Sequence, residues 1–233
     1  MKKLLILFLI FIQFESYSQE ADGIEICLQF QRSLKALSAD KDVEDALDEI
    51  LSVLGDIKNF YLIPCNEINN ALAITYKGER FILYDKDFID KINKVTNDWS
   101  GKFILAHEVG HHINGHTRDF LLASVLDDQS KEKQREEELE ADEFAGFIVA
   151  NLGGRYEQIL ELMDVIGSER DDKYSTHPNK SKRIQAVKKG FNKVISNEVK
   201  NTNNNKDKHI SNEVNVVTNK SKTILSKMEI SFV

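Results

Sequence analysis

The stretch FILAHEVGHH at residues 103–112 decides how this chain folds, because it holds two histidines four positions apart. Residues at that spacing lie on one face of a helix, one turn apart, so the imidazoles of His107 and His111 can both reach a single ion. Glu108 then lies beside that ion without binding it, where it can take up and release a proton. The pattern therefore predicts a metal centre with a neighbouring base.

The helix that carries this stretch is predicted over residues 100–114, with Ser100 as its N-cap and Gly115 at its end. Its apolar residues before His107 are typical of a helix that crosses a domain core. The alternative is a helix whose histidines face water or pack against carbonyl groups. A longer motif with a third histidine would need His at position 117, where this chain has Thr117. His116 lies one position earlier and is interpreted as a helix-end cation near the last carbonyls.

A third metal ligand is predicted from a later helix, over residues 130–152, whose middle is rich in acidic residues. Most of these acids are expected to form a solvated face. Glu138 and Asp142 are four apart and share one face with small Ala141 and Ala145, which would let this helix approach the first one closely. Glu138 could then bind the metal while Asp142 accepts a hydrogen bond from a histidine ligand.

These motifs resemble those of a known family of zinc peptidases. The pair HEVGH at 107–111 and ELEAD at 138–142 is similar to the HExxH and ExxAD motifs of the HtpX and CAAX-prenyl-protease family, which are gluzincins. The segment STHP at 175–178, with Arg183 after it, and the dipeptide Asn70-Ala71 also match the family pattern. The resemblance spans about residues 70–184, with its three long motifs in the family's order.

The resemblance implies a zincin-like domain that binds one Zn²⁺ per chain and cleaves a polypeptide substrate. His107, His111 and Glu138 would hold the metal, and Glu108 would be the general base. His177 and Arg183 would lie near the metal and stabilise the oxyanion that forms during hydrolysis. The strand that begins at Asn70 and Ala71 would bind substrate as an added antiparallel strand.

The other elements are consistent with a predominantly helical α+β fold that has a small sheet at its edge. Helices are predicted at residues 38–54, 85–95, 156–166 and 179–194, and strands at 71–76 and 80–84. We therefore expect one peptidase domain over residues 19–195. The polar segment 196–233, rich in Asn, Lys and Ser, is predicted to be a flexible tail.

The first 18 residues have the pattern of a secretory signal peptide. Lys2 and Lys3 precede an apolar run at 4–12, and Ser16 and Ser18 form a small-x-small cleavage site. The run is shorter than the roughly 20 residues that span a bilayer, although a retained membrane anchor is the alternative. We expect an exported protein, periplasmic or extracellular, without a membrane span in the mature chain.

Two cysteines, Cys27 and Cys65, follow this segment. In an oxidising compartment an even count permits one disulfide, and two separate buried thiols are the alternative. The formal net charge of −7 disfavours nucleic acid as a partner, because phosphate contacts need a basic face.

The sequence thus predicts a soluble, exported zinc endopeptidase, with envelope protein quality control as its expected role. The main alternative is a non-catalytic zinc-binding chaperone or assembly factor of the same fold. A zinc hydrolase that acts on something other than protein is a further alternative. The sequence predicts no oligomeric state.

Overall fold

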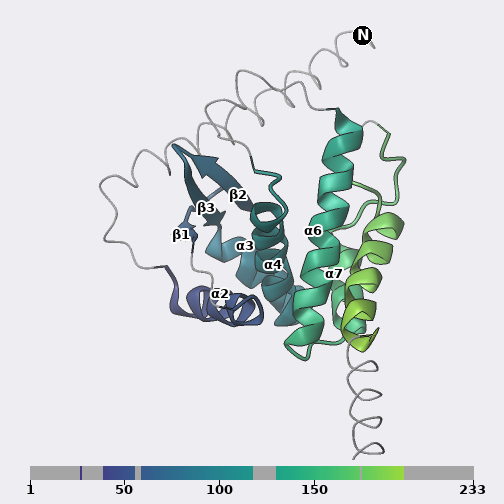
Figure 1. Cartoon of the computed structure of the whole chain (residues 1–233), viewed down its shortest axis with the longest axis horizontal. Helices are drawn as coiled ribbons and strands as arrows, with labels where there is room; N and C mark the ends of the chain where they lie inside the picture. The colour runs from purple at the N-terminus through teal and green to yellow at the C-terminus, as the bar shows by residue number, and fades with distance from the viewer. Residues whose placement is uncertain (1–26, 28–38, 56–58, 118–129, 174, 197–233) are drawn as a thin grey trace, which may run out of the picture. The chain divides into compact units, whose positions relative to one another are not determined.

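The computed structural model describes residues 27, 39–55, 59–117, 130–173 and 175–196 (Figure 1). The described residues up to Phe191 belong to one compact unit, and residues 192–196 belong to a second. The predicted signal peptide and all of the predicted tail except residue 196 lie outside the described residues.

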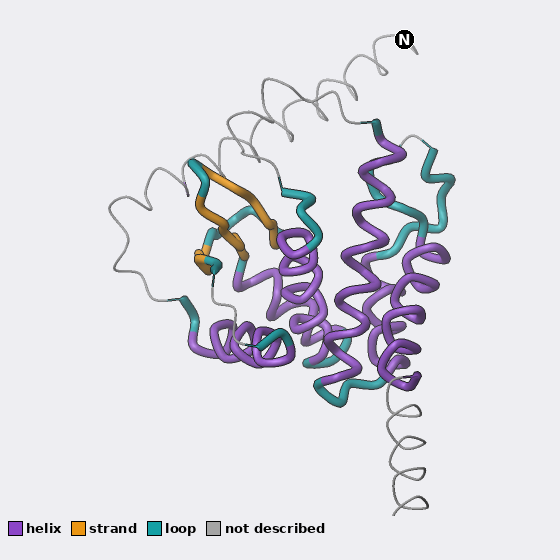
Figure 2. Tube along the Cα trace, viewed as in Figure 1, coloured by secondary structure: helices purple, strands orange, loops and turns teal. Residues whose placement is uncertain are grey.

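The described part is mostly helical with one three-stranded sheet, which confirms the predicted α+β class (Figure 2). The elements are α2 (Lys41–Val53), β1 (Tyr61–Pro64), β2 (Ala71–Tyr76), β3 (Glu79–Tyr84), α3 (Lys86–Val95), α4 (Trp99–Ile113), α6 (Lys131–Asn151), α7 (Tyr156–Ile166) and a helix over residues 180–196. The strand β1 was not predicted.

The sheet has the order β1-β3-β2, so β3 is central and, among the described residues, one edge of β2 has no neighbouring strand. β2 and β3 form an antiparallel hairpin, and its turn residues Lys77 and Gly78 both have positive φ, as two-residue hairpin turns require. β1 pairs with β3 in parallel. Side chains alternate between the two faces along β3: Ile82 and Tyr84 join the main core, while Phe81 and Leu83 join a second apolar cluster.

Helix α4 is the centre of the fold, since it contacts the sheet and the helices α2, α3, α6 and α7. Figure 1 shows α4 between the sheet and α6. Every residue from Phe103 to Gly110 is consequently buried, including His107 and Glu108. The prediction that this helix crosses the core is confirmed.

Small residues let the helices around α4 approach one another closely. A Cβ at Gly110 would lie 3.3 Å from Cα of Ala141, which shows how near α6 runs to α4. On the other side of α6, a Cβ at Gly146 would lie 2.5 Å from the carbonyl oxygen of Val187 in the helix of residues 180–196. The backbones of three helices are thus brought together in the region that holds the predicted site.

Most helix ends agree with the predictions, and one does not. Asp85 caps α3 by accepting hydrogen bonds from the amides of its first turn, and Ser130 caps α6 by accepting one from Lys133. Ser100, predicted as the cap of α4, instead lies inside that helix and is buried. The helix starts one residue earlier, at Trp99, whose amide donates a hydrogen bond to Oδ1 of Asn97.

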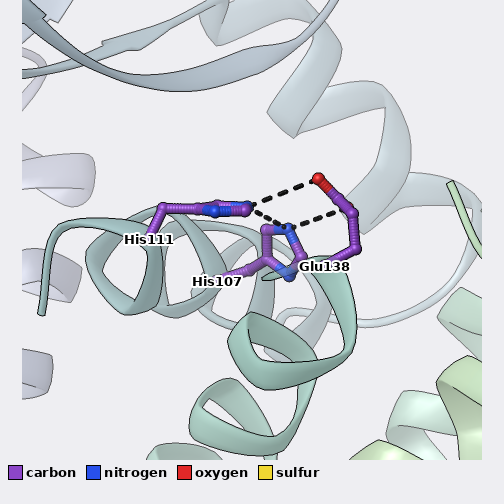
Figure 3. Close-up of side chains that lie close together, drawn as sticks. All are labelled: His107, His111 and Glu138. Carbon is purple, nitrogen blue, oxygen red and sulfur yellow. Dashed lines mark hydrogen bonds and ion pairs between the residues drawn. The ribbon is translucent and has the colours of Figure 1, made fainter. Parts of the chain in front are cut away.

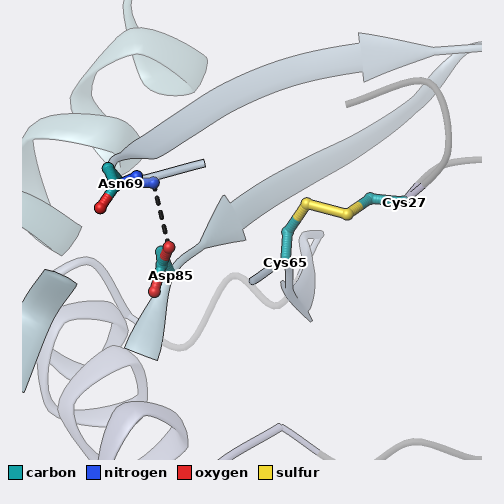
Figure 4. Close-up of a disulfide and its surroundings, with 4 residues drawn as sticks. All are labelled: Cys27, Cys65, Asn69 and Asp85. Carbon is teal, nitrogen blue, oxygen red and sulfur yellow. Dashed lines mark hydrogen bonds between the residues drawn. A yellow bond between two sulfur atoms is a disulfide. The ribbon is translucent and has the colours of Figure 1, made fainter. Parts of the chain in front are cut away.

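A disulfide joins Cys27 to Cys65, with their Cα atoms 5.9 Å apart (Figure 4). Cys65 follows β1 and lies in the second apolar cluster, where Cys27 also packs. Nearby, the amide of Asn69 donates to the Asp85 carboxylate, and the amide of Asp85 donates to the carbonyl of Asn70. The disulfide therefore ties residue 27 to the sheet.

Among the described residues, none of the helices combines the length and the apolar character that a membrane crossing requires.

Candidate metal centre

Helix α4 presents His107 and His111 one turn apart, so that their Nε2 atoms lie 3.1 Å from each other. From α6, Glu138 places one carboxylate oxygen 3.5 Å from Nε2 of His107 and the other 3.5 Å from Nε2 of His111. Figure 3 shows the three side chains converging from the two helices. Among the described residues this is the one group of three or more His, Cys, Asp or Glu side chains that could hold a metal ion.

The distances between these atoms suit a zinc ion. In a tetrahedral zinc site with bonds of about 2.0–2.2 Å, the ligand atoms lie about 3.4 Å from one another. The three separations of 3.1, 3.5 and 3.5 Å are close to that value. Two imidazoles and one carboxylate are also a common donor set for zinc when it keeps a fourth position open. The residues present therefore fit the metal that the sequence predicted.

Asp142 lies directly behind His107, one turn along α6 from Glu138. Its Oδ1 is 3.0 Å from Nδ1 of His107 on the side of the ring that faces away from Glu138. A carboxylate at that position keeps the proton on Nδ1 and leaves the Nε2 lone pair for a metal. The predicted contact between Asp142 and a histidine is thus present in the structure.

Arg183 contacts Asp142 through two hydrogen bonds. Its Nε and Nη2 each donate to a different carboxylate oxygen at 2.8 Å. Both side chains are buried, and Asp142 is 0% exposed. The resemblance implies that Arg183 stabilises an oxyanion. In this structure two of its donors contact the Asp142 carboxylate, which in turn contacts Nδ1 of His107.

The electrostatics of the centre follow from burial and from these contacts. Burial alone would lower the pKa of His107, but the hydrogen bonds to Asp142 and Glu138 outweigh it and raise the pKa. Burial alone would raise the pKa of Glu138, yet its contacts with the two histidines hold it well below the usual range. Metal binding at Nε2 of His107 would displace a proton from that nitrogen and leave the proton on Nδ1.

Glu108 lies at the junction between α4 and the sheet. Its Oε2 accepts a hydrogen bond from the amide of Ala73 in β2, at 2.7 Å. Burial raises the pKa of the Glu108 carboxyl, although the charges of His107 and His111 partly oppose that shift. A carboxylate with a raised pKa is better matched to proton transfer near neutral pH.

The hydrogen bond from the Ala73 amide to Glu108 also shows which backbone N–H and C=O groups of β2 point away from its partner strand, β3. Along an antiparallel pair, residues alternate between those bonded to the partner strand and those whose N–H and C=O point outward. Ala73 points outward, and so do its alternate neighbours Ala71 and Thr75. The sequence named Asn70 and Ala71 as substrate-binding, while the structure brings Ala73 to Glu108. The alternation along an edge strand was the signal that could have identified it.

His177 lies on the loop between α7 and the last helix. Its Nε2 is 3.8 Å from the Glu138 carboxylate, and its side chain is 65% exposed. Arg135 of α6 holds this loop by donating to the carbonyls of Asp172 and Ser175. The structure thus brings His177 to the edge of the three-ligand cluster, next to solvent.

His112, the third histidine of the opening stretch, faces the sheet rather than the cluster. Its Nε2 lies 2.9 Å from the carbonyl of Phe81, and its Nδ1 lies 3.1 Å from the hydroxyl of Thr117. Thr117 in turn accepts a hydrogen bond from Thr75 of β2. Burial lowers the pKa of His112 to about 4, so it is neutral and joins α4 to the sheet.

Residues 100–203 match the family model described as Peptidase U49. No curated protein matches the chain. The matched segment contains most of α4, all of α6 and the loop that carries His177, and it therefore includes the whole three-ligand cluster. The match indicates a peptidase family and supports proteolysis as the activity, at a coarser level than the resemblance to HtpX and CAAX proteases.

Proposed function

We propose that this protein is a zinc-dependent endopeptidase with a zincin-like fold. His107, His111 and Glu138 hold one zinc ion per chain, and Glu108 is the general base. The observation that carries the proposal is the convergence of three ligand atoms at the separations of a tetrahedral zinc site, inside a segment that matches a peptidase family.

When bound, the zinc ion supplies the Lewis acidity that polarises the scissile carbonyl and makes the attacking water more acidic. Glu108 accepts a proton from that water and delivers it to the leaving amine. Its burial and raised pKa suit both steps. His177, whose exposed imidazole lies next to Glu138, donates to the carbonyl oxygen as negative charge develops there.

The substrate is an extended polypeptide that pairs with the edge of β2 opposite β3, which has no neighbouring strand among the described residues. The outward N–H and C=O groups of Ala71 and Thr75, together with the C=O of Ala73, offer backbone hydrogen bonds to such a strand, while the N–H of Ala73 donates to Glu108. Backbone pairing makes few demands on the substrate's side chains, as a quality-control peptidase requires. Because Glu108 contacts Ala73, the base lies at the same edge as the substrate.

We further propose that the chain is exported and acts on envelope proteins, within the HtpX and CAAX-protease relationship that its motifs suggest. The disulfide between Cys27 and Cys65 supports this location, because such bonds persist in oxidising compartments. The signal-like pattern of the first 18 residues supports it as well.

The test pairs zinc content with casein degradation, for the purified chain and its Glu108→Gln variant. The glutamine keeps a side-chain oxygen that can accept from Ala73, so the fold and the zinc should be retained while turnover falls about 10²- to 10⁴-fold. Glu136→Gln, an exposed change on α6, is the matched control.

Equal zinc in all three proteins, with proteolysis lost only in Glu108→Gln, would support the proposal. Zinc without proteolysis in any of them would favour the non-catalytic alternative. A purified chain that binds no zinc would refute the metal centre.

A further inference from the structure

His116 follows the end of α4, and the structure places its side chain where the sequence did not predict it. Gly115 has a φ of 76°, and the amide of His116 donates to the carbonyl of His111 at 2.9 Å, while the amide of Gly115 donates to His112 at 3.3 Å. This pair of bonds is the Schellman motif, which turns the chain back over the last helical turn. The sequence interpretation placed His116 near the last carbonyls of the helix, and its amide does contact one of them, that of His111. The side chain of His116 is 7% exposed.

The motif places the ring of His116 against the ring of His111. Their Nδ1 atoms are 3.2 Å apart, and the two rings meet edge to face with centroids separated by 5.2 Å. On its other side, Nε2 of His116 lies 2.9 Å from a carboxylate oxygen of Glu140 in α6. The three side chains form a continuous chain of contacts that ends on a proposed metal ligand.

The donors and acceptors in this chain are determined once His111 binds a metal. Nε2 of His111 faces His107 and Glu138, so it must offer its lone pair to the ion and the ring proton must lie on Nδ1. That N–H donates to Nδ1 of His116, which leaves the second proton of His116 on Nε2. That proton points to the Glu140 carboxylate, which can only accept. Every contact is then satisfied.

We infer that His116 and Glu140 are positioning residues, which fix the tautomer and the ring orientation of His111 for metal binding. The inference rests on the proposed function, since it assigns these residues to the same metal centre. It gives each imidazole ligand a separate support: Asp142 with Arg183 behind His107, and His116 with Glu140 behind His111.

His116 and Glu140 differ in exposure, and the effects of replacing them should differ accordingly. Outer contacts of this kind change metal affinity about 10- to 100-fold when they are removed. The His116 side chain is only 7% exposed, so its loss should fall in that range. Glu140 is 63% exposed, so water can replace much of its contact, and its loss should weaken binding only a few-fold.

The test measures the zinc affinity of the purified chain and its variants by competition with a chromophoric chelator. His116→Asn places an amide oxygen near the position of Nδ1 and can still accept from His111. His116→Gln places its amide near Nε2, so it can contact Glu140 but does not accept from His111. His116→Ala removes both contacts, Glu140→Gln weakens the outer one, and Glu136→Gln is the control. A urea midpoint without zinc reports whether each variant folds.

The expected order of zinc affinity is unsubstituted chain and control first, then His116→Asn and Glu140→Gln within a few-fold, then His116→Gln and His116→Ala about 10- to 100-fold weaker. If His116→Ala does not fold, the comparison of the Asn and Gln variants still decides. Equal affinity in those two, or unchanged affinity in His116→Ala, would overturn the inference. Zinc binding absent from the unsubstituted chain would instead overturn the proposed function, and the inference with it.

Discussion

Replacing Arg183 by methionine should remove a large part of the stability of this fold. Two hydrogen bonds of 2.8 Å join Arg183 to Asp142, and both side chains are buried. Methionine fills a similar space, but it leaves the carboxylate of Asp142 with His107 as its remaining partner. Removing one member of a buried ion pair costs about 3–5 kcal/mol, because the other charge stays desolvated. Domains of this kind are stabilised by about 5–15 kcal/mol in total.

The assay is urea unfolding of the purified chain without metal. With a slope of about 2 kcal/mol per molar urea, a loss of about 4 kcal/mol should lower the midpoint by about 2 M. The urea midpoint of Arg183→Lys should lie between those of the unsubstituted chain and Arg183→Met, because an ammonium group cannot reproduce the planar pair of donors. Asp142→Asn and the double variant complete a mutant cycle. The double variant should lose less than the sum of the single losses.

Two results would refute this reasoning. A midpoint change in Arg183→Met that corresponds to less than about 1 kcal/mol would mean that the pair is accessible to water, since exposed pairs contribute about that much. Strictly additive losses in the cycle would mean that Arg183 and Asp142 act independently, contrary to their two hydrogen bonds.

Two further changes test the packing and the electrostatics away from the site. Gly190→Ala should lower the melting temperature at a cost of about 1–3 kcal/mol, because its Cβ would lie 2.1 Å from the carbonyl oxygen of Glu143 and would push two helices apart. Alanine in place of glycine within a helix usually leaves the melting temperature unchanged or raises it. That result for Gly190→Ala would contradict this close approach. Tyr84→Phe should flatten the fall of stability at alkaline pH. Burial raises the pKa of Tyr84 above its ordinary value of 10.0, although the hydrogen bond from the amide of Asp40 opposes that shift. Ionisation therefore favours the unfolded chain, and the contribution of Tyr84 is complete below about pH 10 and declines above it, by at most about 1.4 kcal/mol per pH unit. Urea midpoints between pH 8 and pH 11 measure this, and equal slopes in both proteins would rule the explanation out.

The elements with strong local signals could be predicted from the sequence. The strand β2 has the predicted bounds, Ala71–Tyr76, because its β-prone run ends at a turn that contains Gly78. Asp85 and Ser130 cap helices as expected, since the capping oxygen and the amides it accepts from lie within a few residues of each other. The four-residue strand β1 was missed because so short a run that ends in proline carries little pattern of its own.

The same distinction applies to the site. The sequence by itself determined that His107 and His111 share a face of one helix and that Glu138 and Asp142 share a face of another, because helical periodicity is local. Only the tertiary structure decided which atoms meet: Arg183 on Asp142, Ala73 on Glu108, and His116 on His111. The first two join residues 41 and 35 positions apart, and their distances depend on how closely elements pack, which periodicity does not specify. His116 is near in sequence, but its place depends on the turn at Gly115 and on the approach of α6, which brings Glu140 to its other nitrogen. The spacing of residues determines which face of an element carries them, and the packing of those faces determines what they can bind.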